Sequence, residues 1–292
     1  MKKYLPIVLT IFTAGCYQDT IRPDLLEEYR NKMVVTSILT SGKPANLILT
    51  NSLSAIDTNS YRSIQNANIE IQTSSLPMQR MTNVSGDTNY VSNVIGNAGE
   101  SLSIKIKHPE FDLSVSSTVA FPVSVGATAY LTVDGGVDTS GLPGDLIQIA
   151  FNDPGNQSNY YRLKIYYLSQ TTGIWIPLSF IKSDPSLTGY NSYILNDASV
   201  VFSDELFNGY NKVISTVAPS GIVSSNTGDK YKVEFSHISN DFFEYYRSLQ
   251  RAQDSKEISF QGGYNNAVVV HTNIKNGLGI LATQTSIVST LK

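Results

Sequence analysis

Residues 159–168, NYYRLKIYYL, are the stretch that most clearly predicts the fold. Tyr161, Leu163, Ile165 and Tyr167 alternate along it with Tyr160, Arg162, Lys164 and Tyr166. A period of two is typical of a β-strand that turns one face to a core and the other to water. We therefore expect one tyrosine of each doublet to be buried and the other to lie on the outer face.

Runs of the same β type surround this stretch. They include TAYLTV, GDLIQIAFND, GIWIPLSFI, SVVFSD, NKVISTV, DKYKVEFSHI and GLGILATQTSIVST. Asp153-Pro154-Gly155 and Asn208-Gly209 separate some of the runs and are turn-forming sequences. The pattern predicts a C-terminal antiparallel β domain over residues 122–292.

One segment within this part has a helical period. In residues 239–253, SNDFFEYYRSLQRAQ, four large side chains recur at positions i, i+3, i+4 and i+7: Phe242, Tyr245, Tyr246 and Leu249. Ser239 or Asn240 can cap the start of the helix. We expect an amphipathic helix over residues 240–253 whose four-residue stripe packs on the sheet of the C-terminal domain.

The preceding part of the chain also consists of short β-type runs. In SLSIKIK, Leu102, Ile104 and Ile106 alternate with polar residues. Several strands of this kind, separated by turns, predict an immunoglobulin-like β-sandwich over residues 31–121, and Pro122 is a suitable boundary. The predicted fold class is therefore mainly β, with two sandwich-like domains.

Residues 1–16, MKKYLPIVLTIFTAGC, have the features of a bacterial lipoprotein signal. Two lysines precede a short apolar run, and small residues precede Cys16, the only cysteine of the chain. We predict cleavage after residue 15 and acylation of Cys16 with a diacylglycerol and usually a third chain, which would bind membrane lipid. The polar residues 16–30 would form a lipidated tether. An ordinary secretory signal with an incidental cysteine is the alternative.

Composition excludes several classes of function. The formal net charge is −3 and the 21 Lys and Arg residues are scattered, so the chain lacks the basic field that nucleic acid requires. If Cys16 carries lipid, no cysteine remains for a disulfide, a zinc site or a thiol nucleophile. We expect no nucleic-acid partner.

Several phrases in the second half resemble a known family. They are Phe151-Asn152-Asp153-Pro154 with Asn159-Tyr160-Tyr161, the run Ser203-Asp204-Glu205-Leu206-Phe207-Asn208-Gly209, Tyr245-Tyr246 on the helix, and Asn273-Ile274-Lys275-Asn276-Gly277-Leu278-Gly279-Ile280. In this order they resemble the Bacteroidetes-type lipoproteins catalogued as domain of unknown function 4249. The resemblance implies an outer-membrane, surface-exposed accessory subunit of a SusC-like TonB-dependent transporter. From the residues alone, the same phrases are fold-specifying turns.

Motifs of known enzymes are missing from the sequence. It contains no G-x-S-x-G, H-E-x-x-H or G-x-x-x-x-G-K-[ST] phrase. His108, His237 and His271 are far apart in sequence, and we expect them to be solvated or hydrogen-bonded and not metal ligands. Asp134, Asp138 and Asp145 surround a glycine-rich loop that could hold calcium, although a solvated loop is the simpler reading. We expect no enzyme activity, no cofactor and no metal.

Aromatic side chains offer the remaining candidates for binding. Tyr160, Tyr166 and Tyr190 could contact a partner or a small ligand such as a glycan, a peptide or a chelate. Three functions stay open: a capture subunit of a transporter, a surface adhesin or structural lipoprotein, and an unrecognised hydrolase. The hydrolase stays open because a catalytic pair of carboxylates leaves no sequence signature.

Overall fold

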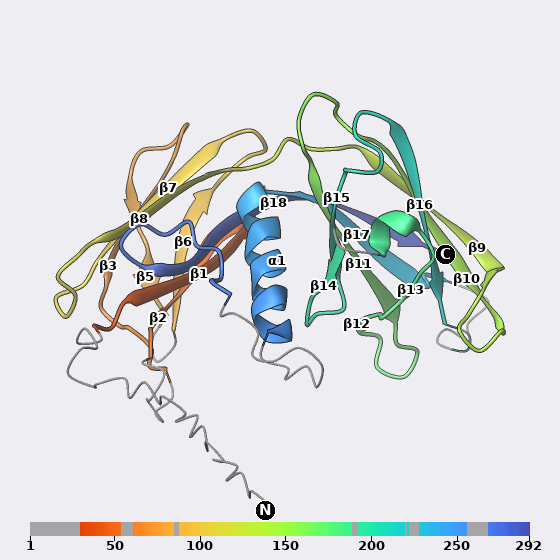
Figure 1. Ribbon diagram of the computed structural model, residues 1–292, viewed down its shortest axis with the longest axis horizontal. Helices are drawn as coiled ribbons and strands as arrows, with labels where there is room; N and C mark the ends of the chain where they lie inside the picture. Colours follow the sequence, from red (N-terminus) through yellow and green to blue (C-terminus); the bar gives the residue numbers. More distant parts are fainter. Residues whose placement is uncertain are drawn as a thin grey trace, which may run out of the picture. The chain divides into compact units, whose positions relative to one another are not determined.

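The computed structural model describes residues 30–53, 61–84, 88–188, 192–219, 221, 228–255 and 268–292. The segment Asn31–Lys292 forms one compact unit, built mainly of strands, with one α-helix in the described part (Figure 1). The prediction of a mainly β, sandwich-like fold is therefore confirmed. The predicted signal peptide, Cys16 and the tether up to residue 29 lie outside the described residues. No helix in the described ranges has the length and apolarity needed to cross a bilayer.

A ten-stranded sheet is the largest feature of the fold. Its order is β14 (Ser192–Ile194), β15 (Val200–Ser203), β11 (Tyr160–Leu168), β17 (Tyr231–Ile238), β18 (Leu278–Leu291), β1 (Met33–Thr40), β2 (Pro44–Asn51), β6 (Asn89–Ile95) and β5 (Thr82–Asn83), with β12 (Trp175–Pro177) also pairing with β11. Strands from both halves of the sequence therefore share one sheet.

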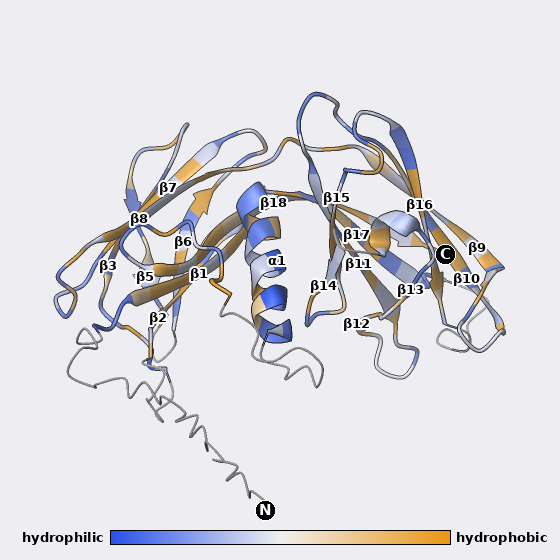
Figure 2. Cartoon of the chain, viewed as in Figure 1, coloured by the Kyte–Doolittle hydropathy of each residue, from blue (hydrophilic) through white to orange (hydrophobic). Residues whose placement is uncertain are grey.

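Two four-stranded sheets pack on this large sheet and form two sandwiches. One runs β4 (Gln79–Arg80), β3 (Asn68–Thr73), β7 (Ser101–Lys107) and β8 (Val115–Ala120); the other runs β13 (Ile181–Lys182), β16 (Asn211–Ala218), β10 (Pro143–Asn152) and β9 (Ala127–Val137). A short 3-10 helix, η2 (Pro185–Leu187), follows β13. Each sandwich encloses its own apolar core. Figure 2 shows the apolar residues distributed along the strands of both.

Strand β18 belongs to both sandwiches. Its first half pairs in parallel with β1, from Val34↔Leu278 to Thr40↔Gln284, and its second half pairs antiparallel with β17, from Ile238↔Gln284 to Tyr231↔Leu291. Leu281 of β18 consequently lies in the first core, and so does Ile274, which precedes the strand, although we assigned residues 122–292 to the second domain. Leu291 lies in the second core. The division of the chain into domains over residues 31–121 and 122–292 stays a prediction.

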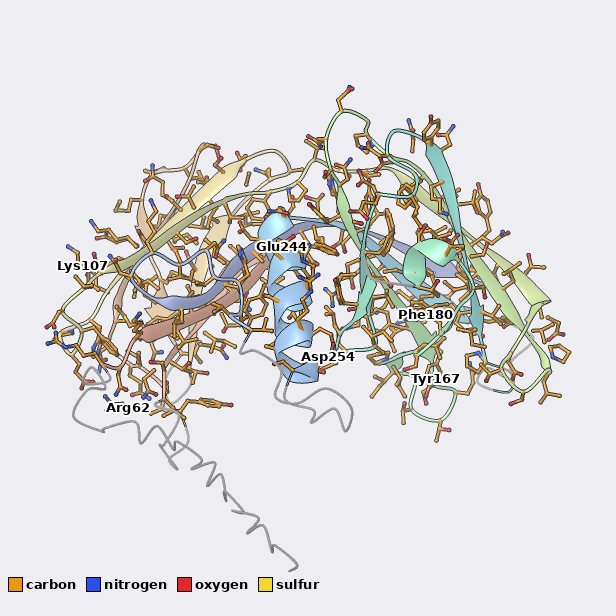
Figure 3. The ribbon with its side chains drawn as sticks, in the orientation of Figure 1. Arg62, Lys107, Tyr167, Phe180, Glu244 and Asp254 are labelled. Carbon is orange, nitrogen blue, oxygen red and sulfur yellow. The ribbon has the colours of Figure 1, made fainter. Side chains whose placement is uncertain are left out.

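The helix α1 (Asn240–Asp254) confirms the predicted helical segment, and Ser239 is its N-cap, accepting the Phe242 N–H at 3.3 Å. It lies against β18 on the face of the large sheet that points away from the two cores (Figures 1 and 3). Phe242 and Phe243 are buried there against Val201 of β15 and against Ile238, Ile280 and Ala282.

The predicted helical stripe was wrong at one position. Phe243 belongs to the apolar cluster under the helix, whereas Leu249 does not, and Tyr245 and Tyr246 are only partly buried. The reason is that α1 contacts β14 as well as β18. A helix with neighbours on two sides buries a wider arc than a helix that rests on one surface.

Candidate functional site

A cluster of buried polar side chains lies at the end of the second sandwich. The Asp153 carboxylate accepts the Tyr161 hydroxyl through one oxygen and the Gly209 N–H, at 2.7 Å, through the other. Asp153 is 2% exposed and Tyr161 is fully buried. Gly209 has a φ of +79°, a conformation that suits glycine, so Asp153 ties the turn at residues 208–209 to strand β11.

A second carboxylate holds the neighbouring loop. Asp204 Oδ2 accepts the Asn159 N–H at 2.8 Å and its side-chain amide at 3.2 Å, and that amide also donates to Pro154 O at 2.7 Å. Burial raises the pKa of Asp204, and the charge of Asp153 raises it further, although the hydrogen bonds from Asn159 oppose both effects. These contacts support the reading of the phrases as fold-specifying turns, because they join loops distant in sequence.

A groove of about 440 Å³ lies beside this cluster. Its walls come from the end of β8, the connection at Pro122 and Val123, the loop that enters β11, the end of β17 and the start of α1. Tyr160, one of the three tyrosines predicted to contact a ligand, lines the groove and stacks on Phe243, with ring centroids 4.7 Å apart. Its role as a contact stays a prediction.

His237 is the most distinctive residue of the groove. It is 6% exposed, its Nδ1 lies 2.9 Å from the carbonyl oxygen of Val123, and its ring lies 5.3 Å from that of Tyr161. A carbonyl only accepts, so Nδ1 carries the hydrogen. Burial lowers the pKa of His237, although the bond to Val123 and the charges of Asp153 and Asp204 act in the opposite direction. Burial thus favours the neutral imidazole, in which Nε2 presents a lone pair.

A second histidine is linked to the groove through Asp241. Asp241, in the first turn of α1, lines the groove, and its carboxylate lies 2.8 Å from Nε2 of His271. The backbone N–H of His271 donates to Ser248 Oγ at 2.7 Å. Within the described chain, neither imidazole hydrogen-bonds to a serine hydroxyl, so the arrangement differs from an activated serine nucleophile.

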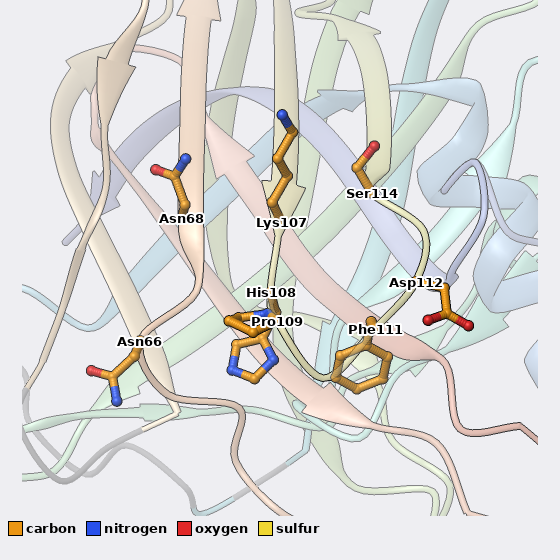
Figure 4. A pocket seen from close by; sticks show the side chains of 8 residues that line it. All are labelled: Asn66, Asn68, Lys107, His108, Pro109, Phe111, Asp112 and Ser114. Carbon is orange, nitrogen blue, oxygen red and sulfur yellow. The ribbon is translucent and has the colours of Figure 1, made fainter.

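A separate pocket of about 540 Å³ opens at the end of the first sandwich (Figure 4). His108, the third histidine, lies there with Lys107, Phe111 and Asp112. Its Nε2 lies 3.1 Å from Gln65 O, and its Nδ1 accepts the Glu110 N–H at 3.2 Å. Because both ring nitrogens bind the backbone, His108 shapes the loop and has no nitrogen left for a ligand.

Tyr166, which was also predicted to contact a ligand, lies far from Tyr160. Tyr166 lies on the same face of β11 six residues further along, which is about 20 Å at 3.3 Å per residue. Its hydroxyl donates to Glu234 at 3.2 Å, and the Nζ atoms of Lys164 and Lys232 lie 5.0 and 4.2 Å from its ring centre. Tyr190 lies outside the described residues.

The carboxylates of the glycine-rich loop point to different partners. Asp145 accepts the Asp134 N–H at 3.0 Å and the Tyr231 hydroxyl at 2.9 Å, while Asp138 accepts the N–H groups of Ser140 and Leu142. Among the described residues, no group of three or more His, Cys, Asp or Glu side chains is placed to hold a metal ion. The loop is therefore explained by its own hydrogen bonds.

Asp197 gives a prediction about acid stability. Burial alone would raise the pKa of Asp197, but hydrogen bonds from Lys164 and Ser199 and the charges of Arg162 and Lys164 outweigh it and lower the pKa from 3.8 to about 2. Stability from this group is complete above pH 3.8 and is lost as the pH falls towards 2. We expect Asp197→Asn to lower the melting temperature at pH 6, and the difference from the wild type to shrink between pH 4 and 2. Glu110→Gln, in an exposed pair with Arg62, is the control and should show little effect at pH 6. A constant difference for Asp197→Asn across this range would contradict the assignment.

Comparison with known proteins assigns the chain to a protein family. The sequence pattern of the family described as "Domain of unknown function (DUF4249)" matches residues 18–287. A search of curated proteins found no match. The match covers nearly all of the chain, including β1, β11, α1 and most of β18. The chain therefore belongs to the DUF4249 family.

Proposed function

We propose that this protein is a non-enzymatic outer-membrane lipoprotein, anchored through Cys16, that captures a substrate for a SusC-like TonB-dependent transporter. The observation that carries the proposal is the order of two features in the sequence. Small residues lead directly to the single cysteine at position 16, and the family match begins at residue 18. A lipidated cysteine would therefore stand at the start of the family's own domain.

Anchoring supplies a physical reason for the partnership. A cysteine with two or more acyl chains stays in the membrane, because each buried methylene adds about 0.8 kcal/mol. Two proteins confined to one membrane meet at a raised effective concentration, so a modest interface keeps them together. The tether of residues 16–30 would give the folded unit reach, and the groove at Tyr160 and His237 offers a place for a small ligand.

The test is purification of the tagged full chain from membranes in a mild detergent. We expect a TonB-dependent transporter to co-purify with the wild type, and the Cys16→Ala variant to remain an unprocessed precursor without stable anchoring or the transporter. Mass spectrometry of the mature N-terminus reports the acyl chains directly. An unmodified Cys16 thiol, or a wild-type preparation without any transporter, would contradict the proposal.

One observation favours the adhesin or structural alternative. In the described chain, β9 pairs only with β10 and leaves its other edge open, and residues 127–133 carry no charge. Tyr130 and Val133 on this strand are more than half exposed. Uncharged open edges pair readily with strands of other chains. A ladder of detergent-stable oligomers in the same purification, in place of a transporter, would support this alternative.

A further inference from the structure

We propose that the groove beside His237 binds a primary ammonium group of a ligand, with Nε2 of His237 as the hydrogen-bond acceptor. This site does not depend on the anchor or on a transporter. It would take a free amine or the side chain of a lysine residue, since both present the same group.

The acceptor is His237 Nε2. The fully enclosed side-chain atoms without a hydrogen-bond partner in the described chain are the hydroxyl oxygens of Ser186 and Ser203. His237 Nε2 also has no hydrogen-bond partner among the described residues, but it is not one of these enclosed atoms. It therefore keeps some accessible surface, although His237 as a whole is only 6% exposed. Since His237 lines the groove, that surface faces the groove. A buried acceptor without a donor is stabilised by a ligand that supplies one.

The charges around the groove favour a cation. Its lining contains Asp241 but neither lysine nor arginine among the described residues. Asp153 and Asp204 lie behind His237 and act on its charge, and no ion pair with a described cation neutralises either of them. The groove therefore has Asp241 on its lining, paired with His271, and two further carboxylates behind His237, but no lysine or arginine on its lining, and this balance favours a positive ligand.

The start of α1 does not reverse this preference. A helix N-terminus attracts anions through its free N–H groups. Here the Ser239 hydroxyl accepts the N–H of Phe242, and Asp241 already supplies a negative charge in the first turn. An additional anion in the groove would meet the carboxylate of Asp241 at close range.

Binding should depend on pH through His237. Protonation of Nε2 removes the lone pair and adds a repelling charge, so acid weakens binding. The groups around the ring are the Val123 carbonyl, the Tyr161 ring and the carboxylates of Asp153 and Asp204, and Asp241, paired with His271, also lines the groove. The apparent dissociation constant should rise about tenfold for each pH unit below the pKa of His237.

The chain contains three histidines, so selective ¹⁵N labelling gives a simple spectrum. We would titrate the labelled full chain, in detergent micelles at pH 7.5, with n-butylammonium, 1-butanol and butanoate. The expected result is a saturable shift of the His237 Nε2 resonance with n-butylammonium alone. Nα-acetyl-lysine amide and its Nε-acetylated form then test whether a lysine side chain is accepted as well.

Matched variants separate binding from folding. His237→Asn keeps an N–H for Val123 and removes Nε2, and it should abolish binding as read from the His271 resonances. Asp241→Asn should weaken binding about tenfold, a factor typical of one charged contact, whereas Glu244→Gln, one turn along α1 and paired with Arg247, should not. Equal shifts with 1-butanol, a saturable shift with butanoate, no saturation with any probe, or equal weakening by Asp241→Asn and Glu244→Gln would overturn the proposal.

Discussion

The Gly279→Ala variant is expected to lose about 3 to 5 kcal/mol of stability, the sum of a strained backbone and a forced contact. Gly279 lies in β18 opposite Val35 of β1 and has a φ of +95°. Residues that carry a Cβ atom rarely adopt this backbone conformation. A Cβ atom at this position would lie 2.0 Å from the Val35 carbonyl oxygen. Because backbone atoms cannot move aside cheaply, the β1–β18 pairing must shift or break.

Gly126→Ala is the matched control. A Cβ atom at Gly126 meets nothing within 4 Å, and its φ lies outside the positive region. The substitution should therefore change stability by less than about 0.5 kcal/mol. Urea denaturation of the two variants and the wild type measures the effects, and similar midpoints for Gly279→Ala and Gly126→Ala would show that β18 does not approach β1 as closely as described.

The Phe242→Ala variant should lose about 3 to 5 kcal/mol, the usual cost of truncating a buried aromatic residue. Phe242 is 1% exposed, its ring lies 5.2 Å from that of Tyr246, and it packs with Ile280 and Ala282 beneath α1. Its loss leaves a cavity where the helix meets the two sandwiches. Tyr246→Ala should cost less, because Tyr246 is only partly buried.

Arg247→Ala tests whether the correct face of α1 points inward. Arg247 pairs with Glu244 within the helix and belongs to no apolar cluster. Ion pairs at positions i and i+3 of a helix, such as this partly exposed one, contribute about 0.2 to 0.5 kcal/mol. Thermal unfolding of Phe242→Ala and Arg247→Ala should therefore give clearly different melting temperatures. An equal decrease in melting temperature for the two variants would mean that α1 buries a different face.

The periodicity of the sequence predicted the strands and the helix of this fold, but it did not predict which strands pair with one another. The alternation along residues 159–168 correctly placed Tyr161, Leu163 and Ile165 in a core. The parallel pairing of β1 with β18 joins residues more than 200 positions apart, and neither strand carries a local sign of the other. Phe243 was missed because a helical period reveals one buried stripe and cannot show a second neighbour.

The groove was predictable only in part. Tyr160 was singled out as an aromatic residue on the outer face of a strand, and it does line the groove. His237 follows Val233 and Phe235 at intervals of two, so its position in the core was readable from the same alternation. The free Nε2 of His237 could not be predicted, because the hydrogen bond that fixes the tautomer goes to the Val123 carbonyl, over a hundred residues earlier in the chain.

The position of β18 has a consequence for the order in which the chain can fold. A ribosome makes residues 278–291 after all the other strands of the described chain, yet they occupy the centre of the ten-stranded sheet. Until they emerge, β1 and β17 lack the neighbour that joins them, and neither sandwich can close its large sheet. Long-range pairings of this kind also form slowly. A nascent polypeptide whose large sheet stays open until β18 is made can still be threaded through a translocation channel, which suits the export that we propose for it.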